Sequence, residues 1–186
     1  MTKKAMIIIL SAPSGCGKSS IADQLIKDDS NIVLSISCTT RKPRPEEVDG
    51  VHYFFKSLED FKNEDYLETA EIYGNLYGTP VKFVQDNLAR GNDVLFDIDY
   101  QGAKQIMEKS AAKVVSIFII PPNMETLKQR IIMRGQDDES VIKMRMEEAY
   151  LEIEYAKYYD HIVINDDFSK AVKEIEHIIH EARYNR

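Results

Sequence analysis

The segment that most constrains the fold covers residues 7–20 and reads IIILSAPSGCGKSS. An apolar run typical of a buried strand leads directly into a glycine-punctuated loop that ends in Lys-Ser-Ser. Such a loop turns consecutive backbone N–H groups onto phosphate oxygens, and the helix that follows adds partial positive charge at its N-terminus. The segment therefore predicts a strand–loop–helix unit that binds nucleotide phosphates.

Individual residues of this loop suit separate tasks. Lys18 can reach the terminal phosphates, and the Ser19 hydroxyl is placed to ligate Mg²⁺. The usual motif begins with glycine, whereas this chain has Ala12, whose methyl group is tolerable if φ stays negative. The alternative is a plain glycine-rich turn, which the ordered run of strand, loop and helix disfavours. The predicted cradle comprises Ala12, Pro13, Ser14, Gly15, Cys16, Gly17, Lys18, Ser19 and Ser20.

Apolar runs alternate with amphipathic stretches along the rest of the chain. Uniformly apolar strands separated by helices are typical of a parallel sheet that is covered on both faces. We therefore expect an α/β fold, a three-layer α/β/α sandwich of the P-loop NTPase type. The expected strands are residues 6–10, 32–36, 93–98, 114–120 and 161–165. The expected helices are residues 19–27, 81–90, 101–109, 123–134, 140–158 and 169–183.

The length of 186 residues fits one domain, within which two stretches depart from the alternation. Residues 37–79 are rich in tyrosine, acidic residues and turn signals, which predicts a small inserted subdomain. An irregular acidic piece between two arginine-bearing helices predicts a lid over about residues 126–158. The core would then comprise residues 1–36, 80–125 and 159–186.

Composition limits the partners and the compartment. Acidic residues outnumber basic ones by 31 to 24, and the net charge of −7 argues against long nucleic acid as a partner. Cys16 and Cys38 have no metal-ligand spacing, and we expect no disulfide. The first apolar run is too short for a signal peptide or a membrane span, so we expect a cytoplasmic protein without a membrane partner.

A second anion site is indicated downstream of the second expected strand. Arg41 and Arg44 lie three residues apart around a proline turn, and Ser37 and Tyr53 flank them. Guanidinium groups suit bidentate contact with a phosphate, and hydroxyl groups can complete its shell. The alternative is a pair of solvated turn residues, and only the accompanying phosphate loop favours the functional interpretation.

Carboxylates follow the third expected strand. Asp97 and Asp99 lie at its carboxyl end, where side chains of open α/β sheets face the ligand crevice. An aspartate in this place commonly serves Mg²⁺ through water, so Asp97 joins Ser19 as a candidate metal residue. Either aspartate could instead cap the following helix.

Taken together, these motifs resemble the guanylate kinase family over nearly the whole chain. The resemblance rests on APSGCGKSS, SCTTRKPRP, DGVHYFF, EIYGNLYGT, DIDYQG and VINDD, in that order. It implies transfer of the γ-phosphate of ATP to GMP, with Mg²⁺, in an enzyme whose core, GMP-binding region and lid close together. The phosphate cradle would hold ATP, and Asn165 would lie near its adenine, although Asn165 could equally cap the end of its strand.

The resemblance also assigns the acceptor site. It implies a GMP phosphate held by Ser37, Arg41, Arg44, Tyr53 and Tyr77, and a base read by Glu68, Thr79 and Asp99. The chemistry supports this assignment, because guanine presents N1–H and a 2-amino group as adjacent donors that a carboxylate can accept. Adenine lacks that pair of donors.

Catalytic roles fall to Lys18 and to two lid arginines, Arg134 and Arg145. The resemblance places both arginines on the phosphates during transfer, whereas the sequence alone allows ordinary charge on a helix surface. Phosphoryl transfer spreads charge over the moving group, which positioned cations stabilise.

Two rival functions stay open at the level of the sequence. A kinase for another small acceptor, such as AMP, dGMP or a phosphorylated sugar, could use the same scaffold. Domains that resemble guanylate kinases also act as non-catalytic peptide-binding modules, which typically lack an intact phosphate loop. The sequence does not decide between a monomer and a homo-oligomer.

Overall fold

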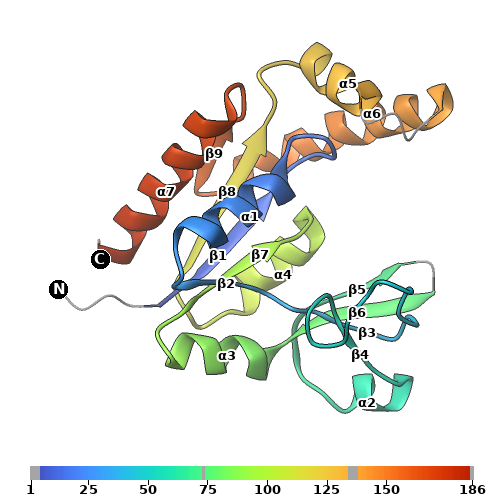
Figure 1. Ribbon diagram of the computed structural model, residues 1–186, viewed down its shortest axis with the longest axis vertical. Coiled ribbons are helices and arrows are strands. Elements are labelled where there is room, and N and C mark those ends of the chain that lie inside the picture. Colours follow the sequence, from blue (N-terminus) through green and yellow to red (C-terminus); the bar gives the residue numbers. More distant parts are fainter. Residues whose placement is uncertain (1–4, 73, 134–137, 185–186) are drawn as a thin grey trace.

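The computed structural model describes residues 5–72, 74–133 and 138–184, and it is built around a parallel five-stranded sheet (Figure 1). The strand order is β2-β7-β1-β8-β9, and every neighbouring pair is parallel. The predicted parallel α/β sheet is confirmed. The strands are β1 (Ile7–Ser11), β2 (Ile32–Leu34), β7 (Asp93–Asp97), β8 (Val114–Ile120) and β9 (His161–Ile164).

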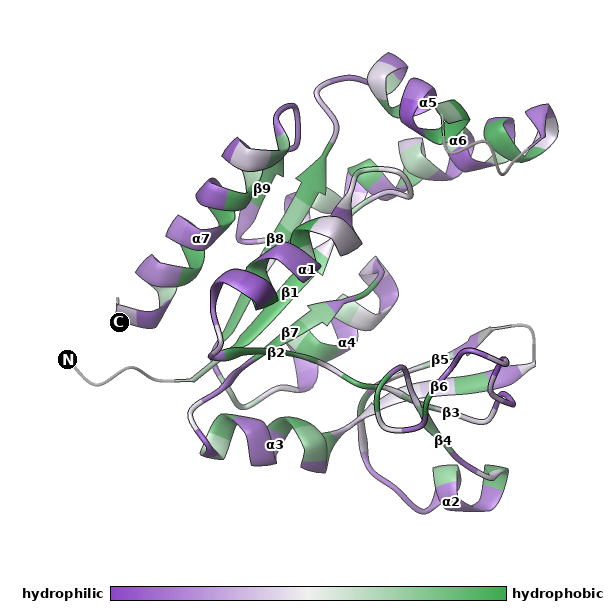
Figure 2. Cartoon of the chain, in the orientation of Figure 1, coloured by the Kyte–Doolittle hydropathy of each residue, from purple (hydrophilic) through white to green (hydrophobic). Residues whose placement is uncertain are grey.

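Helices cover both faces of this sheet because its central strands are apolar on both sides. Ile8 and Leu10 of β1 pack in one core, whereas Ile7 and Ile9 pack in the other. Figure 2 shows the hydrophobic strands between helices whose outward sides are polar. The first core is covered by α1 (Lys18–Asp28), α5 (Met124–Met133) and α7 (Phe168–Tyr184), and the second by α3 (Val81–Ala89) and α4 (Tyr100–Lys109).

A second, four-stranded sheet lies beside the first and holds the stretch that departs from the alternation (Figure 1). Its order is β4-β3-β6-β5, and β5 and β6 form an antiparallel hairpin. Gln105 of α4 joins this hairpin to the core by hydrogen bonds with both backbone groups of Thr69. The elements are β3 (Cys38–Thr39), β4 (Phe54–Phe55), α2 (Leu58–Lys62), β5 (Tyr66–Ile72) and β6 (Asn75–Pro80).

The helix expected over residues 140–158 is present but changes type over its last five residues. The structure has α6 (Glu139–Ile153) followed by a 3-10 turn over Glu154–Tyr158. Ala149 of α6 packs in the first core, whereas Ala156 and Tyr159 pack in the second. The more tightly wound 3-10 turn thus lies where the chain passes from one face of the sheet to the other within a few residues.

The last strand also differs from expectation. Uniform apolarity predicted burial on both faces, but β9 lies at the sheet edge, where Ile162 is 49% exposed and Ile164 is 54% exposed. Val163 alone of this strand is buried. The apolar run therefore identified the strand correctly but did not indicate that it lies at the sheet edge.

The end of the sheet opposite the phosphate loop is closed by a buried ion cluster. Arg183 of α7 donates from Nε to Asp93, 2.6 Å away, and pairs with Asp29 at 2.6 Å. Asp93 is fully buried and also accepts the backbone N–H of Met6 at 2.9 Å. These contacts fix the C-terminal helix to the start of two strands.

Candidate nucleotide-binding site

The phosphate loop joins β1 to α1 in the way that the sequence predicts. Gly15 and Gly17 adopt φ values of 95° and 84°, a region in which other L-residues are strained. A Cβ atom on Gly17 would lie 2.9 Å from Nδ2 of Asn165, and one on Gly15 would lie 3.0 Å from side-chain atoms of Leu127 and Ile131. Both conformation and space therefore require glycine at these positions.

A cavity of about 310 Å³ opens over this loop. Eight of the nine predicted cradle residues line it, and the exception is Cys16, whose side chain is buried in the first core. Two carboxylate residues from other elements complete the lining. The residues that line the cavity are Ala12, Pro13, Ser14, Gly15, Gly17, Lys18, Ser19, Ser20, Asp99 and Glu152.

The charged end of the cradle is held by Asp97 at the end of β7. Lys18 Nζ lies 2.5 Å from Oδ1 of Asp97 and donates to the carbonyl of Ile98 at 3.2 Å. The Ser19 hydroxyl donates to Oδ2 of Asp97 at 2.7 Å. The loop lysine, the loop serine and the strand aspartate thus meet at one point.

This donor set fits Mg²⁺. Magnesium prefers oxygen ligands and is typically held by one or two protein groups, with water and substrate phosphates supplying the rest. The Ser19 hydroxyl and the Asp97 carboxylate offer such oxygens side by side. Within the described ranges no cluster of three or more His, Cys, Asp or Glu residues could hold a metal ion by itself.

Asn165 braces the phosphate loop from beyond the last strand. Its Nδ2 donates to the carbonyl of Cys16 at 2.8 Å, and its side chain is 5% exposed. Among the described residues Oδ1 of Asn165 has no hydrogen-bond partner. A buried carbonyl oxygen without a partner is suited to accept from a ligand amine, so the predicted place near adenine stays a prediction.

The predicted anion site in the second sheet is assembled around Arg41. Its Nε donates to the Tyr77 hydroxyl at 3.2 Å, and its guanidinium carbon lies 5.6 Å from the centre of the Tyr53 ring. The Tyr53 and Tyr77 rings meet edge to face at 5.8 Å. Arg44 is exposed on the turn that follows.

Sequence reasoning missed Glu47, which orders this turn. Its carboxylate accepts from both terminal nitrogens of Arg41, at 2.8 and 2.9 Å, and from the backbone N–H of Arg44 at 2.7 Å. These hydrogen bonds, that of Arg41 first, lower the pKa of Glu47 to about 2. The signal in the sequence was a glutamate three residues beyond Arg44, within the same turn.

The predicted base-reading residues form a buried polar chain. Thr79 donates to Oε1 of Glu68 at 2.8 Å, and its hydroxyl lies 3.0 Å from that of Ser37. Glu68 is 6% exposed, and burial raises its pKa although the Thr79 hydrogen bonds oppose the shift. A buried carboxylate with one oxygen already satisfied is suited to accept from a ligand donor.

Asp99 links the two halves of the site. Its carboxylate caps α4 by accepting from the backbone N–H of Gly102 at 3.0 Å, which is the capping role that the sequence left open. It also lines the phosphate-loop cavity and raises the pKa of Glu68 by its negative charge. Asp99 therefore lies between the phosphate cradle and the predicted base-reading residues.

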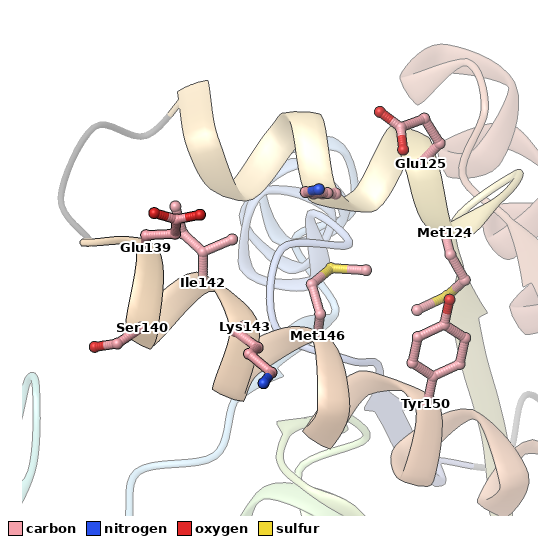
Figure 3. A pocket seen from close by; sticks show the side chains of 9 residues that line it. Met124, Glu125, Glu139, Ser140, Ile142, Lys143, Met146 and Tyr150 are labelled. Carbon is pink, nitrogen blue, oxygen red and sulfur yellow. The ribbon is translucent and has the colours of Figure 1, made fainter.

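The structure describes one of the two predicted lid arginines. Arg145 lies on α6 and is partly buried, whereas Arg134 lies outside the described residues. A separate cavity of about 810 Å³ opens between α5 and α6, where Met124, Met146 and Tyr150 point toward one another (Figure 3). It contains none of the predicted site residues.

Neither cysteine forms a disulfide, as expected, and both are buried. Burial raises the pKa of Cys38 to about 11, so its thiol stays protonated at neutral pH. In the described part of the chain no helix combines the length and the apolarity needed to cross a membrane.

Comparisons with known proteins agree with this geometry. The family model described as "Guanylate kinase" matches residues 4–182. The guanylate kinase of Rickettsia bellii is 52% identical over the full length of both chains, and that of Rhizobium meliloti is 44% identical over all of this chain and 87% of its own.

A solved structure gives the same result. The crystal structure of guanylate kinase from Anaplasma phagocytophilum superposes with a TM-score of 0.75 at 34% identity, covering all of this chain and 89% of that one. The match thus includes the phosphate loop, the second sheet and the helices above the loop. The chain belongs to the guanylate kinase family.

Proposed function

We infer that the protein is a GMP kinase that transfers the γ-phosphate of ATP to GMP, giving ADP and GDP. One observation carries this inference. Asp99 lines the phosphate cradle and also acts by its charge on Glu68, a buried carboxylate that could read guanine. Family membership agrees with this chemistry.

The ATP half uses the loop over residues 12–20, with Asn165 beside the adenine. Backbone N–H groups of the loop would bind the phosphates, and Lys18 would neutralise charge on the terminal ones. Ser19 and Asp97 would hold Mg²⁺, which bridges phosphate oxygens when bound. Nucleotide binding would then draw Lys18 from Asp97 to the phosphates.

The GMP half uses the second sheet. Arg41, Arg44, Tyr53, Tyr77 and Ser37 would bind the phosphate, since they offer cationic and hydroxyl donors and Arg41 contacts both tyrosines. Glu68 and Thr79, together with Asp99, would bind the base. An adenine would leave the buried Glu68 carboxylate unpaired, and such a loss can discriminate by roughly 10⁴-fold.

The transfer itself requires charge stabilisation rather than a covalent nucleophile. An oxygen of the GMP phosphate is already ionised at neutral pH and can attack directly. Lys18 and the lid arginines, Arg134 and Arg145, would stabilise charge on the moving group. Closure of the second sheet (residues 37–79) and the lid (residues 126–158) onto the core would exclude water and suppress ATP hydrolysis.

The wider expectations follow the same reasoning. We propose that the protein acts in the cytoplasm, since its first apolar run is too short for a signal peptide. We also expect that it does not bind long nucleic acid, since its net charge of −7 repels polyanions. A non-catalytic module is disfavoured, because the two loop glycines, Lys18 and Ser19 are all present in working geometry. A different acceptor is disfavoured by the buried Glu68–Thr79 pair.

An acceptor panel tests this function. Purified protein with ATP and Mg²⁺ is incubated with GMP, dGMP, AMP or a sugar phosphate, and ADP and the phosphorylated product are measured. We expect rapid GDP formation and AMP turnover lower by roughly 10⁴-fold. Absence of GDP, or equal turnover of AMP, would contradict the assignment, and the dGMP arm measures the contribution of the 2′-hydroxyl.

A further inference from the structure

Glu152 is a carboxylate of the lid helix that lies inside the phosphate-loop cavity. It stands near the C-terminal end of α6, three residues after Ala149, which is fully buried in the first core with Leu127 and Ile131. Residues three apart share a helix face, so the packing of Ala149 turns Glu152 toward the loop. No motif in the sequence singled out this residue.

The surroundings of Glu152 are those of a bound anion. Its carboxylate shares the cavity with Ser14 and Lys18, and the backbone N–H of Ser14 and the charge of Lys18 both favour its ionised form. Burial raises the pKa of Glu152, and the negative charges of Glu148 and Asp99 add to that shift. A phosphate loop aims its N–H groups at anions, and here a carboxylate from another element lies in the cavity that they face.

We propose that Glu152 is a positioning residue that holds Ser14 while the phosphate loop is empty and is expelled when nucleotide phosphates arrive. A triphosphate and a carboxylate cannot share one N–H group, and their charges repel each other across a short distance in a partly desolvated cavity. The contact is therefore one of two alternatives, selected by the nucleotide.

Expulsion of Glu152 would act on the lid, because this residue and Arg145 belong to one helix. They lie seven residues apart, about two turns, and so on one side of α6. Movement of the C-terminal part of α6 shifts the predicted transfer arginine relative to the loop. Glu152 would thus transmit occupancy of the ATP half to the lid, an inference that rests on the proposed function only for the identity of the ligand.

The test compares Glu152→Gln with Glu148→Gln. The amide of the first variant can still accept from Ser14 but carries no charge, and Glu148 is an exposed residue of the same helix that changes charge equally. Calorimetric titration with a non-hydrolysable ATP analogue and Mg²⁺ measures affinity. We expect E152Q to bind the analogue about tenfold more tightly than wild type, and E148Q to change by less than about twofold.

Hydrogen exchange of α6 provides a second readout. Replacing a residue with only a structural role would not change how this exchange responds to nucleotide. In wild type the analogue should change the exchange of residues 139–153. In Glu152→Ala the nucleotide-free protein should already show the exchange of the bound state, so that the analogue adds no further change. If E152A does not fold, E152Q carries the test, because it preserves shape and acceptor.

Two results would overturn the proposal: E152Q binding the analogue like E148Q, or binding it more weakly than wild type. The second would mean that Glu152 helps to hold the nucleotide. KM values extend the test, since E152Q should lower KM for ATP and leave KM for GMP unchanged. Failure of wild type to form GDP would instead refute the proposed function, while the titration still decides the role of Glu152.

Discussion

The ATP half and the GMP half of the site are supported in opposite ways. The phosphate loop stands between a strand that is buried on both faces and a helix packed into the first core. Among its described residues the second sheet adds no fully buried side chain to either core cluster, although the partly buried Leu67 packs against the second core. The buried apolar side chains of its region are those of Cys38, Phe61 and Pro80. Thr39, Glu68 and Thr79 are buried there as polar residues.

This difference indicates which half moves. A loop fixed by core packing keeps its N–H groups in place before the nucleotide arrives, which is the requirement for electrostatic stabilisation. A sheet that contributes little apolar surface to the core can shift as a unit at a lower cost in free energy, since the shift exposes little apolar surface to water. We therefore expect the proposed GMP half to be the part that closes onto the proposed ATP half.

The largest expected effect comes from the rigid half. Lys18→Met removes the cation that the loop presents to the phosphates, and we expect kcat to fall about 10²- to 10³-fold. Steady-state kinetics with GMP and ATP measure the loss. Lys27→Met, at the far end of the same helix, is the control, and a similar loss in that variant would mean that the effect is structural.

The free energy of unfolding should also distinguish ion pairs of the core sheet from those of the second sheet. Arg183→Met leaves the fully buried Asp93 without its cation, and we expect a loss of about 3–5 kcal/mol in the free energy of unfolding. Lys56→Met breaks the pair with Glu64 in the second sheet, where both side chains are about one-quarter exposed, and should cost about 1 kcal/mol. Urea unfolding measures both variants, and equal losses would refute the contrast.

The sequence predicted best the segments whose structure is encoded by adjacent residues. Residues 7–20 carry their structure locally, because the apolar run, the glycines and the helix start are adjacent. Glu47 and Glu152 were missed, since their roles depend on what folds against them: Arg41 across a turn and Ser14 from another element. The 3-10 turn after α6 and the exposed edge of β9 also follow from tertiary packing, which local apolarity does not encode.

A base-reading variant should move activity and stability in opposite directions. Glu68→Gln replaces an acceptor with a group that also donates toward guanine, and we expect kcat/KM for GMP to fall about 10²-fold while ATP binding is unchanged. Burial raises the pKa of Glu68, so its ionised form costs stability, and E68Q should melt a few degrees higher. Glu71→Gln, exposed on the same strand, is the control for both measurements.

The smallest effect is a pH dependence confined to the GMP half. Since burial raises the pKa of Glu68, this carboxyl protonates at a pH above the value of about 4.3 for free glutamate. Protonated Glu68 no longer accepts from both guanine donors, so KM for GMP should rise about tenfold for each pH unit below that pKa. The stability term has the opposite sign: it is present at low pH and is lost as the pH rises through the raised pKa.

The comparison of wild type with E68Q isolates this group. The GMP phosphate also titrates, near pH 6, but it does so equally with both proteins, so the ratio of their KM values reports Glu68 alone. Glu47 does not interfere, because its pKa of about 2 keeps it ionised throughout this range. A ratio that stays constant between about pH 4 and pH 8 would show that the carboxylate does not read the base, and the division between a phosphate-anchoring half and a base-reading half would then fail at its central residue.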